Sequence, residues 1–219
     1  MPTATLEEYL EAIYKLAQHG QVRPTQVAES VGVSGPTVTA TLRRLEAHGL
    51  VVRDGTKVVL TDEGVQRSLD IVRRHRIAET FLVDTLGLDW NAAHEEACVL
   101  EHALSPRVLS ALEIFLDNPS VCPHGHPIPA ADGSFVDVAG MPLCDVASGA
   151  SATVLAVAEE DEKILSYLGE LGLRPGARAK VLEVAPFQGP LTIEIEGIRT
   201  AIAREIAKLV TVALPAESN

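Results

Sequence analysis

One nine-residue segment gathers four side chains that can bind a transition metal. Between positions 94 and 102 two His, a Cys and a Glu occur at i, i+4, i+7 and i+8: they are His94, Cys98, Glu101 and His102. On a helix these positions form a single stripe, so we expect the four side chains to face the same way. The segment is therefore a candidate metal-binding helix.

Two other segments show related spacing. His75 and Glu79 stand at i and i+4, and Glu8 and Glu11 near the N-terminus stand at i and i+3. A solvated surface pair is the alternative explanation for any one of these pairs. Three helices that each present ligands on one face are enough for two metal sites, and the six residues on the two later helices together favour that interpretation.

The elements that must position these residues begin with a winged helix-turn-helix. Apolar residues at three- and four-residue steps predict a first helix over 6–17. A short second helix over 25–31, a tight turn at Gly32 and a third helix with Ser34 as N-cap follow. Two β-rich runs around Asp54-Gly55 then predict a hairpin. Three helices and a hairpin in this order predict a DNA-binding unit, with protein contact by the same fold as the alternative.

The third helix would enter the major groove with its N-terminal end, and backbone amides there can meet phosphates. The side chains near the bases are small hydroxyls and methyls, so readout should depend more on van der Waals contact and DNA shape than on bidentate Arg pairs. The residues that we expect at DNA are Ser34, Gly35, Pro36, Thr37, Thr39, Ala40, Arg43 and Arg44 of the helix, with Arg53 and Lys57 beside the hairpin tip.

The rest of the chain predicts helices first and strands later. Helices are expected from Thr61 to about Leu86, from Asp89 or Asn91 to Leu104, and over 105–116. A proline-rich stretch follows, and then short β runs with one helix indicate a small β-barrel. The fold class is mainly α with small β. The expected domains are a winged helix-turn-helix over 1–62, a helical metal-binding and dimerisation domain over 63–140, and a small β-barrel over 148–214.

Composition supports a folded, cytoplasmic protein. Of 219 residues 47% are hydrophobic and 22% charged, which is typical of a globular chain with a core. We see no membrane-spanning run and no signal stretch. The net charge of −12 would argue against a nucleic-acid partner, but 1–76 hold ten Lys and Arg against nine Asp and Glu, whereas 77–219 hold eight against 21. The predicted DNA-binding unit is thus near neutral.

Several motifs together resemble the diphtheria toxin repressor and manganese transport regulator family. They are Leu6-Glu7-Glu8-Tyr9-Leu10-Glu11-Ala12-Ile13-Tyr14, Ser34-Gly35-Pro36-Thr37-Val38-Thr39, Arg73-Arg74-His75-Arg76-Ile77-Ala78-Glu79, His94-Glu95-Glu96-Ala97-Cys98 with Glu101-His102, and Leu168-Gly169-Glu170-Leu171-Gly172-Leu173-Arg174-Pro175-Gly176. The last motif resembles the FeoA-like barrel of longer members. The resemblance implies a homodimer that binds double-stranded operator DNA when loaded with a divalent metal, and repression of metal-uptake genes.

The resemblance also implies two ligand sets. The primary set would be Glu8, Cys98, Glu101 and His102, with Glu11 as a further ligand; the ancillary set would be His75, Glu79 and His94, with Cys122, His124 and Glu160 added in some members. Glu8 replaces the Met of iron-type members and favours Mn²⁺, whereas Cys98 is the iron-type choice and leaves Fe²⁺ as the alternative. Zn²⁺, Co²⁺ or Cd²⁺ can substitute in vitro.

Two other classes of protein stay open from the sequence. The segment His94-Glu95-Glu96-Ala97-Cys98 partly matches the His-Glu-x-x-His of zinc hydrolases, but the two further ligands on the same helix leave little room for a catalytic position. A winged-helix regulator that senses an organic effector is the other. The β-barrel could lend a metal ligand, contact the dimer core, or bind a proline-rich segment.

Overall fold

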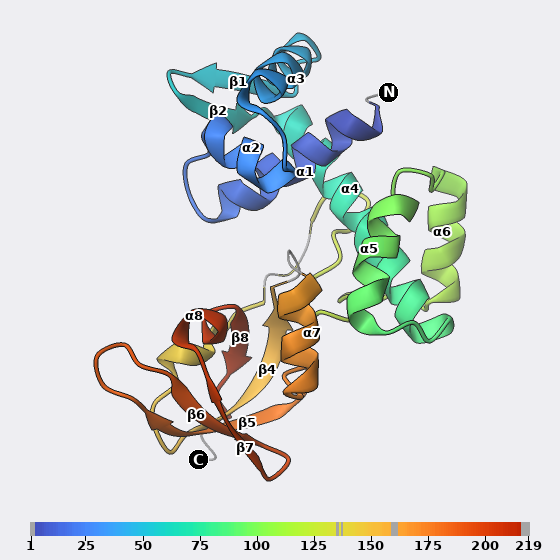
Figure 1. The fold of residues 1–219 in the computed structure, drawn as a ribbon. Coiled ribbons are helices and arrows are strands. Elements are labelled where there is room, and N and C mark those ends of the chain that lie inside the picture. The colour runs from blue at the N-terminus through green and yellow to red at the C-terminus, as the bar shows by residue number, and fades with distance from the viewer. Residues whose placement is uncertain (1–2, 135, 137, 159–161, 216–219) are drawn as a thin grey trace. The chain divides into compact units, whose positions relative to one another are not determined.

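The computed structural model describes residues 3–134, 136, 138–158 and 162–215. It divides into two compact units (Figure 1). The first comprises 1–75, 100–109 and 129–134, and the second comprises 76–99, 110–128 and 135–219. Within the part of the chain that the structure describes, no helix is both long and apolar enough to cross a membrane.

The first unit is built around a winged helix-turn-helix. Its elements are α1 (Ala4–Gln18), α2 (Pro24–Val31), α3 (Gly35–Ala47), β1 (Val51–Asp54), β2 (Lys57–Leu60) and the start of α4 (Asp62–Thr80). Leu6, Leu10 and Ile13 form the apolar stripe of α1 and are fully buried against residues of α3 and the hairpin. Burying a side chain of this size stabilises a fold by roughly 1.5–3 kcal/mol, so α1 is firmly fixed in this unit.

The wing forms where the sequence predicts it, with the turn one residue later. β1 and β2 are antiparallel with Asp54 opposite Lys57, so the two loop residues are Gly55 and Thr56. Gly55 adopts φ +61°, a left-handed conformation that glycine takes without strain. The Val58 amide donates to the Val22 carbonyl and ties the wing to the loop before α2.

The helical segments that follow match the predicted boundaries except at the C-terminal end of the helix that was expected to reach Leu104. α4 continues into a π-helical turn (Phe81–Thr85) that stops before Gly87, as predicted. α5 (Trp90–Leu100) ends four residues earlier than predicted, and α6 (Pro106–Phe115) begins at the expected proline. Pro106 disfavours helical geometry at Ser105, and the chain closes a turn with Ala103 and Leu104 amides on the Leu100 carbonyl. Glu101 and His102 therefore lie in a turn rather than on the helical stripe that the spacing predicted.

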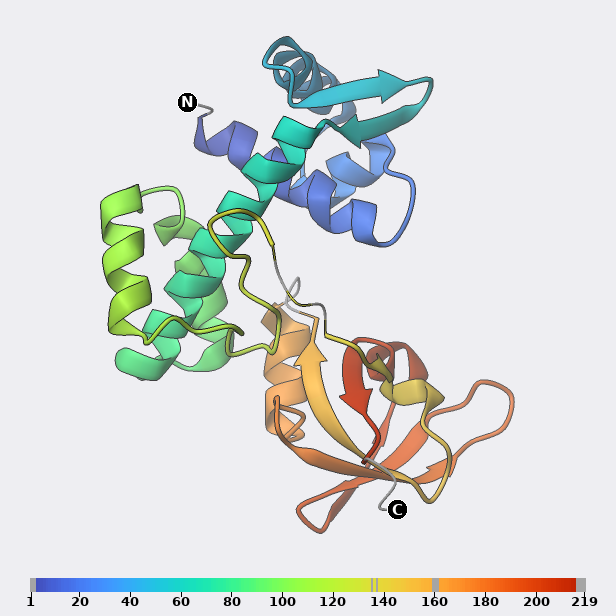
Figure 2. The same cartoon turned by 180° about the vertical axis from the view of Figure 1, so that it is seen from behind.

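The C-terminal part of the second unit is a six-stranded antiparallel sheet in the order β3-β8-β4-β5-β6-β7 (Figures 1 and 2). Its elements are β3 (Met141–Pro142), a 3₁₀ turn (Leu143–Asp145), β4 (Ser151–Val157), α7 (Glu162–Glu170), β5 (Arg178–Val184), β6 (Leu191–Ile195), β7 (Ile198–Ile202), α8 (Arg204–Ala207) and β8 (Val210–Ala213). Leu165 and Leu168 of α7 pack into the core that the inner faces of the strands form. β3, β7 and α8 were not predicted from the sequence.

Candidate metal centres and nucleic-acid interface

The first unit brings together ligand-type residues from three separate segments. Glu11 of α1, His75 of α4 and Glu101 of the turn after α5 each place one ligand atom within 4.8 Å of the others. His75 Nδ1 lies 2.8 Å from Glu101 Oε2, and His102 Nε2 lies 3.3 Å from Glu101 Oε1. We call Glu11, His75, Glu101 and the adjoining His102 the first cluster.

The environment of Glu101 favours a cation there. Its side chain is 2% exposed, and burial raises the pKa of this carboxyl above its ordinary value. The hydrogen bond with His75 and the charges of both imidazoles oppose that rise in pKa, whereas the charge of Glu11 adds to it. A buried carboxylate with a second carboxylate beside it is stabilised by a bound cation, so the donor set fits a divalent metal.

The two ligands predicted on α1, Glu8 and Glu11, differ in their exposure. Glu11 is partly buried in the first cluster and pairs with Lys15 at 3.0 Å. Glu8 is exposed, and the partly buried Glu7 beside it is the residue whose carboxylate lies 2.8 Å from His102 Nδ1. Sequence reasoning missed Glu7, and its only signal there was its place in the Leu6–Tyr14 motif.

The second unit holds another group of potential ligands. Glu79 of α4, Cys122 and His124 each place one ligand atom within 4.8 Å of the others, and all three are buried. His124 Nδ1 and His94 Nδ1 lie 3.3 and 2.9 Å from Glu79 Oε1. We call Glu79, His94, Cys122 and His124 the second cluster. It contains a thiol, two imidazoles and a carboxylate, a donor set that suits transition metals.

A tight turn places Cys122 and His124 in this cluster. The Gly125 amide donates to the Cys122 carbonyl, and the Cys122 amide donates to the carbonyl of His126, so the segment 122–126 folds back on itself. The Val157 amide of β4 donates to the His124 carbonyl, and His126 Nε2 donates to the Val157 carbonyl at 2.7 Å. The turn is thus fastened to the sheet on both sides of Gly125.

Among the described residues, two predicted ligands lie outside both clusters: the exposed Glu8 of α1, and Cys98. Cys98 lies on α5 one turn after His94 and is exposed. Glu160 lies outside the described residues. Of the ligands expected from sequence, the structure thus places Glu11, His75, Glu101 and His102 in one unit, and Glu79, His94, Cys122 and His124 in the other.

The third helix presents the expected surface. Ser34, Gly35, Pro36, Thr37, Ala40, Arg43 and Arg44 are exposed, whereas Thr39 is partly buried. Ser34 is the N-cap of α3, but its hydroxyl is 2.8 Å from the Thr37 hydroxyl and makes no hydrogen bond to a helix amide. The two hydroxyls at the start of the helix are therefore paired with each other.

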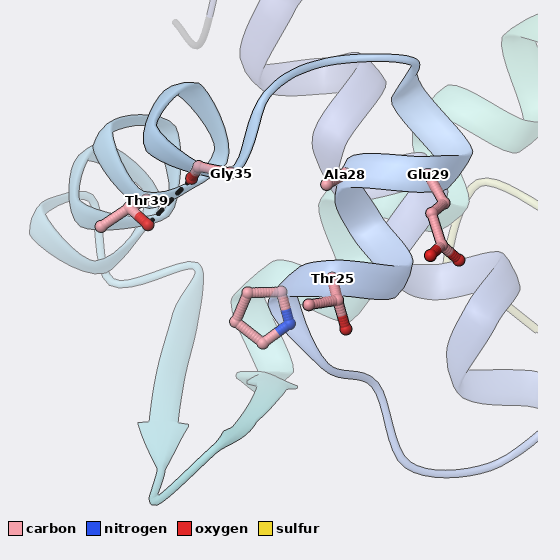
Figure 3. A pocket seen from close by; sticks show the side chains of 6 residues that line it. Thr25, Ala28, Glu29, Gly35 and Thr39 are labelled. Atoms are coloured by element: carbon pink, nitrogen blue, oxygen red, sulfur yellow. Dashed lines mark hydrogen bonds between the residues drawn. The ribbon is translucent and has the colours of Figure 1, made fainter.

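A cleft of about 400 Å³ separates α2 from the start of α3 (Figure 3). It is lined by Pro24, Thr25, Ala28, Glu29, Gly35 and Thr39. The Thr39 hydroxyl donates to the Gly35 carbonyl at 3.0 Å, the bond drawn as a dashed line in Figure 3. With its proton used in this way, Thr39 can offer a ligand its methyl group and an oxygen that only accepts hydrogen bonds.

The two basic residues of the wing differ in availability. Arg53 is held by Glu46 of α3 at 2.6 Å, and this hydrogen bond raises the pKa of the guanidinium further above its ordinary value. Lys57 is partly buried on β2, opposite Asp54. The ion pair fastens the wing to the third helix, although an exposed pair of this kind contributes only about 0–1 kcal/mol.

Three family models match the chain in sequence. They are the N-terminal DNA-binding domain of iron-dependent repressors over residues 1–59, the metal-binding and dimerisation domain of iron-dependent repressors over 61–130, and the FeoA domain over 141–214. The matches follow one another in the order in which the structure shows the helix-turn-helix, the helical segments and the sheet.

Individual proteins match over nearly the whole chain. The iron-dependent repressor IdeR of Mycobacterium leprae is 35% identical over 208 residues, which cover 88% of this chain and 89% of that protein. A manganese-dependent transcriptional repressor in complex with manganese superposes with a TM-score of 0.88 at 35% identity, covering 96% of this chain and all of the other. ScaR with bound Cd²⁺ superposes with a TM-score of 0.85 at 32% identity, over 96% and 99% of the two chains.

Proposed function

Because this chain belongs to the diphtheria toxin repressor family of metal-dependent transcriptional repressors, we propose that it represses metal-uptake genes in the cytoplasm. It binds operator DNA as a homodimer when divalent metal occupies its two clusters. Mn²⁺ is the proposed physiological metal, with Fe²⁺ as the alternative. The role is regulatory rather than catalytic.

The observation that supports this most directly is the double role of α1. One face of this helix holds Leu6, Leu10 and Ile13 in the core of the helix-turn-helix, and Glu11 reaches the first cluster. The other members of the cluster come from α4 and the turn after α5. A metal held by all three segments fixes α1, and with it the third helix, relative to α4.

This arrangement gives metal a route to DNA affinity. Metal shifts the population toward the DNA-competent arrangement only to the extent that it binds that arrangement more tightly. DNA must then raise the metal affinity by the same factor, because the coupling is reciprocal. When bound, the ion supplies positive charge that holds the clustered carboxylates and imidazoles together. Without this charge the carboxylates would repel one another.

The resemblance gives the primary metal Glu8, Cys98, Glu101 and His102 with Glu11 as a further ligand, and it gives His75 to the ancillary site. Because His75 lies with Glu11 and Glu101, we add it to the proposed primary ligands. Glu79, His94, Cys122 and His124 would hold a second metal, with Glu160 as an additional candidate. The oxygen and imidazole donors of the first cluster favour Mn²⁺. The thiol of the second cluster suits softer ions, so Zn²⁺, Co²⁺ or Cd²⁺ can bind there in vitro.

An apolar surface in the second unit supports the homodimer. The exposed fractions of Val99, Ile114 and Phe115 are 72%, 74% and 64%. All three belong to α5 and α6 of the predicted dimerisation domain, and a homodimer interface on these helices would cover them. Ile77, Leu82 and Leu109 are buried within the chain and belong to its core.

The DNA-binding residues are proposed from the exposed part of α3 and the wing. Ser34, Gly35, Pro36, Thr37, Thr39, Ala40, Arg43, Arg44 and Lys57 would contact DNA, and Arg53 would do so only if it left Glu46. Phosphate contacts by Arg43 and Arg44 would set the register, while Thr39 and Ala40 would contact bases through methyl groups.

A metal-titrated binding assay tests the proposal. Duplexes would first be selected from a random-sequence library with the full chain in Mn²⁺, and affinity then measured anaerobically at buffered free Mn²⁺ or Fe²⁺. The Glu101→Ala variant should lose metal-dependent binding and stay folded. Glu205→Ala, which removes an exposed carboxylate of α8, is the matched control and should behave like the unchanged protein. Unchanged metal dependence in Glu101→Ala would reject the assigned site.

A further inference from the structure

We propose that Glu7 is a positioning residue of the first cluster, which orients His102 by accepting a hydrogen bond from its Nδ1. This inference rests on the proposed function of that cluster as a metal site. Glu7 contacts His102 and Arg74.

The contacts of Glu7 define its role as a hydrogen-bond acceptor. Arg74 Nη2 lies 3.2 Å from Glu7 Oε1, and Arg74 Nη1 lies 3.4 Å from Glu7 Oε2. A guanidinium has donors only, so both oxygens of Glu7 accept hydrogen bonds in this arrangement. His102 Nδ1, 2.8 Å from Glu7 Oε2, must therefore carry the proton of that bond.

The tautomer of His102 follows from this bond. With the proton on Nδ1, a neutral imidazole has its lone pair on Nε2. Nε2 faces Glu101 Oε1 at 3.3 Å. Two ligand atoms bound about 2.1 Å from one ion, at about a right angle, lie about 3.0 Å apart. The spacing of these two atoms fits a shared metal ion, and Glu7 holds the imidazole in the orientation that presents Nε2 to it.

Arg74 fixes both Glu7 and the turn that contains Glu101 and His102. Its Nη1 also donates to the Glu101 main-chain carbonyl at 2.8 Å, and its Nε lies 3.2 Å from Asp70 Oδ2 on the same helix. The guanidinium thereby ties the turn that contains Glu101 and His102 to α4 and, through Glu7, to α1. An outer carboxylate on a ligating His raises its basicity and fixes its ring, and losing such a partner typically weakens metal binding 10–100-fold.

Glu7 also extends the coupling to DNA. It lies on α1 next to Leu6, which is buried in the core of the helix-turn-helix. Through Glu7 the position of α1 governs the orientation of His102, in addition to the direct reach of Glu11. Glu7 and Glu11 would therefore both make the geometry of the first cluster depend on the position of α1, Glu7 through His102 and Glu11 directly.

The tautomer can be observed without metal. Chelator-treated full-length protein with ¹⁵N-labelled histidine would be studied by NMR at a pH where the imidazole is neutral, with His102→Gln used to assign the ring signals. We expect His102 to carry its proton on Nδ1. In Glu7→Ala the ring should shift toward the Nε2–H tautomer that free histidine prefers, whereas Glu205→Ala, which removes an exposed carboxylate of α8, should leave it as it is. Retention of the Nδ1–H tautomer in Glu7→Ala would overturn the proposal.

Mn²⁺ binding gives the second readout, measured by calorimetry with the chain carrying Cys122→Ala and His124→Ala so that the first cluster is read alone. Glu7→Ala should weaken Mn²⁺ binding roughly 10–100-fold. Glu7→Gln should recover part of the loss, because its amide oxygen can still accept the Nδ1 proton. An Mn²⁺ Kd within twofold of the unchanged protein in Glu7→Ala contradicts the inference. Glu101→Ala separates the two claims: if it leaves Mn²⁺ binding intact, the site itself is misassigned.

Discussion

The turn that places Cys122 and His124 depends on a close approach at Gly125. A Cβ built on Gly125 would lie 1.9 Å from the Leu155 carbonyl oxygen and 2.8 Å from Ala156 Cα. Both atoms belong to the backbone of β4, which the sheet holds in place. Gly125→Ala therefore cannot be accommodated by rotating a side chain, and the turn must move away from β4.

The expected loss can be worked out with a control. Gly125 has φ +87° and Gly149 has φ +86°, but a Cβ at Gly149 would meet nothing within 4 Å. Both substitutions place an alanine in the left-handed region, which costs roughly 1 kcal/mol. Gly125→Ala additionally breaks the two hydrogen bonds that join His124 and His126 to Val157, each worth about 1 kcal/mol. We expect the free energy of unfolding to fall by about 3 kcal/mol in Gly125→Ala and by about 1 kcal/mol in Gly149→Ala.

Trp90 provides the assay, since it is the only tryptophan of the chain and its ring centroid lies 4.9 Å from that of His124. Urea unfolding of metal-free protein followed by Trp90 fluorescence gives the two free energies. Calorimetry should also show that Gly125→Ala loses the metal bound by the second cluster, whereas Gly149→Ala keeps it. Equal losses of stability in the two variants, with second-cluster binding intact in both, would refute the role given to this turn.

Three more predictions follow from the clusters and surfaces. Because burial raises the pKa of Glu101, its ionised form destabilises the metal-free fold increasingly as the pH rises from the ordinary carboxyl pKa through the raised one. The unfolding temperature of metal-free Glu101→Gln should therefore rise relative to that of the unchanged protein between pH 4 and pH 8. A constant difference in unfolding temperature would contradict this. Replacing thymine by uracil in a selected duplex should lower the DNA affinity of the unchanged protein and of Thr39→Val, but not that of Thr39→Ser. Equal losses of affinity in the two variants would exclude methyl readout. Ile114→Asp should convert the dimer to a monomer in sedimentation, whereas an unchanged dimer would place the interface elsewhere.

Apolar periodicity was sufficient to predict much of the fold. The stripe of α1, the short α2 and the hairpin of the wing are each specified by local sequence. β7 was not predicted because its five residues, Ile198–Ile202, alternate weakly and the strand pairs along one edge only, with β6. The early end of α5 was missed as well, since residues 101–104 have helix-compatible side chains and the turn is set by Pro106 and by tertiary contacts.

Spacing alone made the candidate site predictable in residue type, whereas the grouping of Cys122 and His124 with Glu79 was expected only from the family resemblance. Spacing identified His75 and Glu79 as ligand-type residues on the right helix, and Glu101 as a ligand-type residue although it lies in the turn after α5. It could not show that Cys122 and His124, more than 40 residues beyond Glu79, share its cluster, because that proximity comes from the fold of the turn on β4. Nor could it distinguish Glu7 from Glu8, because these adjacent residues point about 100° apart on α1 and only the fold shows which of them faces His102.

The central claim is that metal in the first cluster sets the affinity for DNA. The most direct test is fluorescence anisotropy of a library-selected duplex with the full chain, at buffered free Mn²⁺ and in chelator, repeated at a second salt concentration. The account predicts tight, sequence-specific binding with Mn²⁺, weak binding in chelator, and the loss of that difference in Glu101→Ala. Equal affinity with Mn²⁺ and with chelator in the unchanged protein would contradict it.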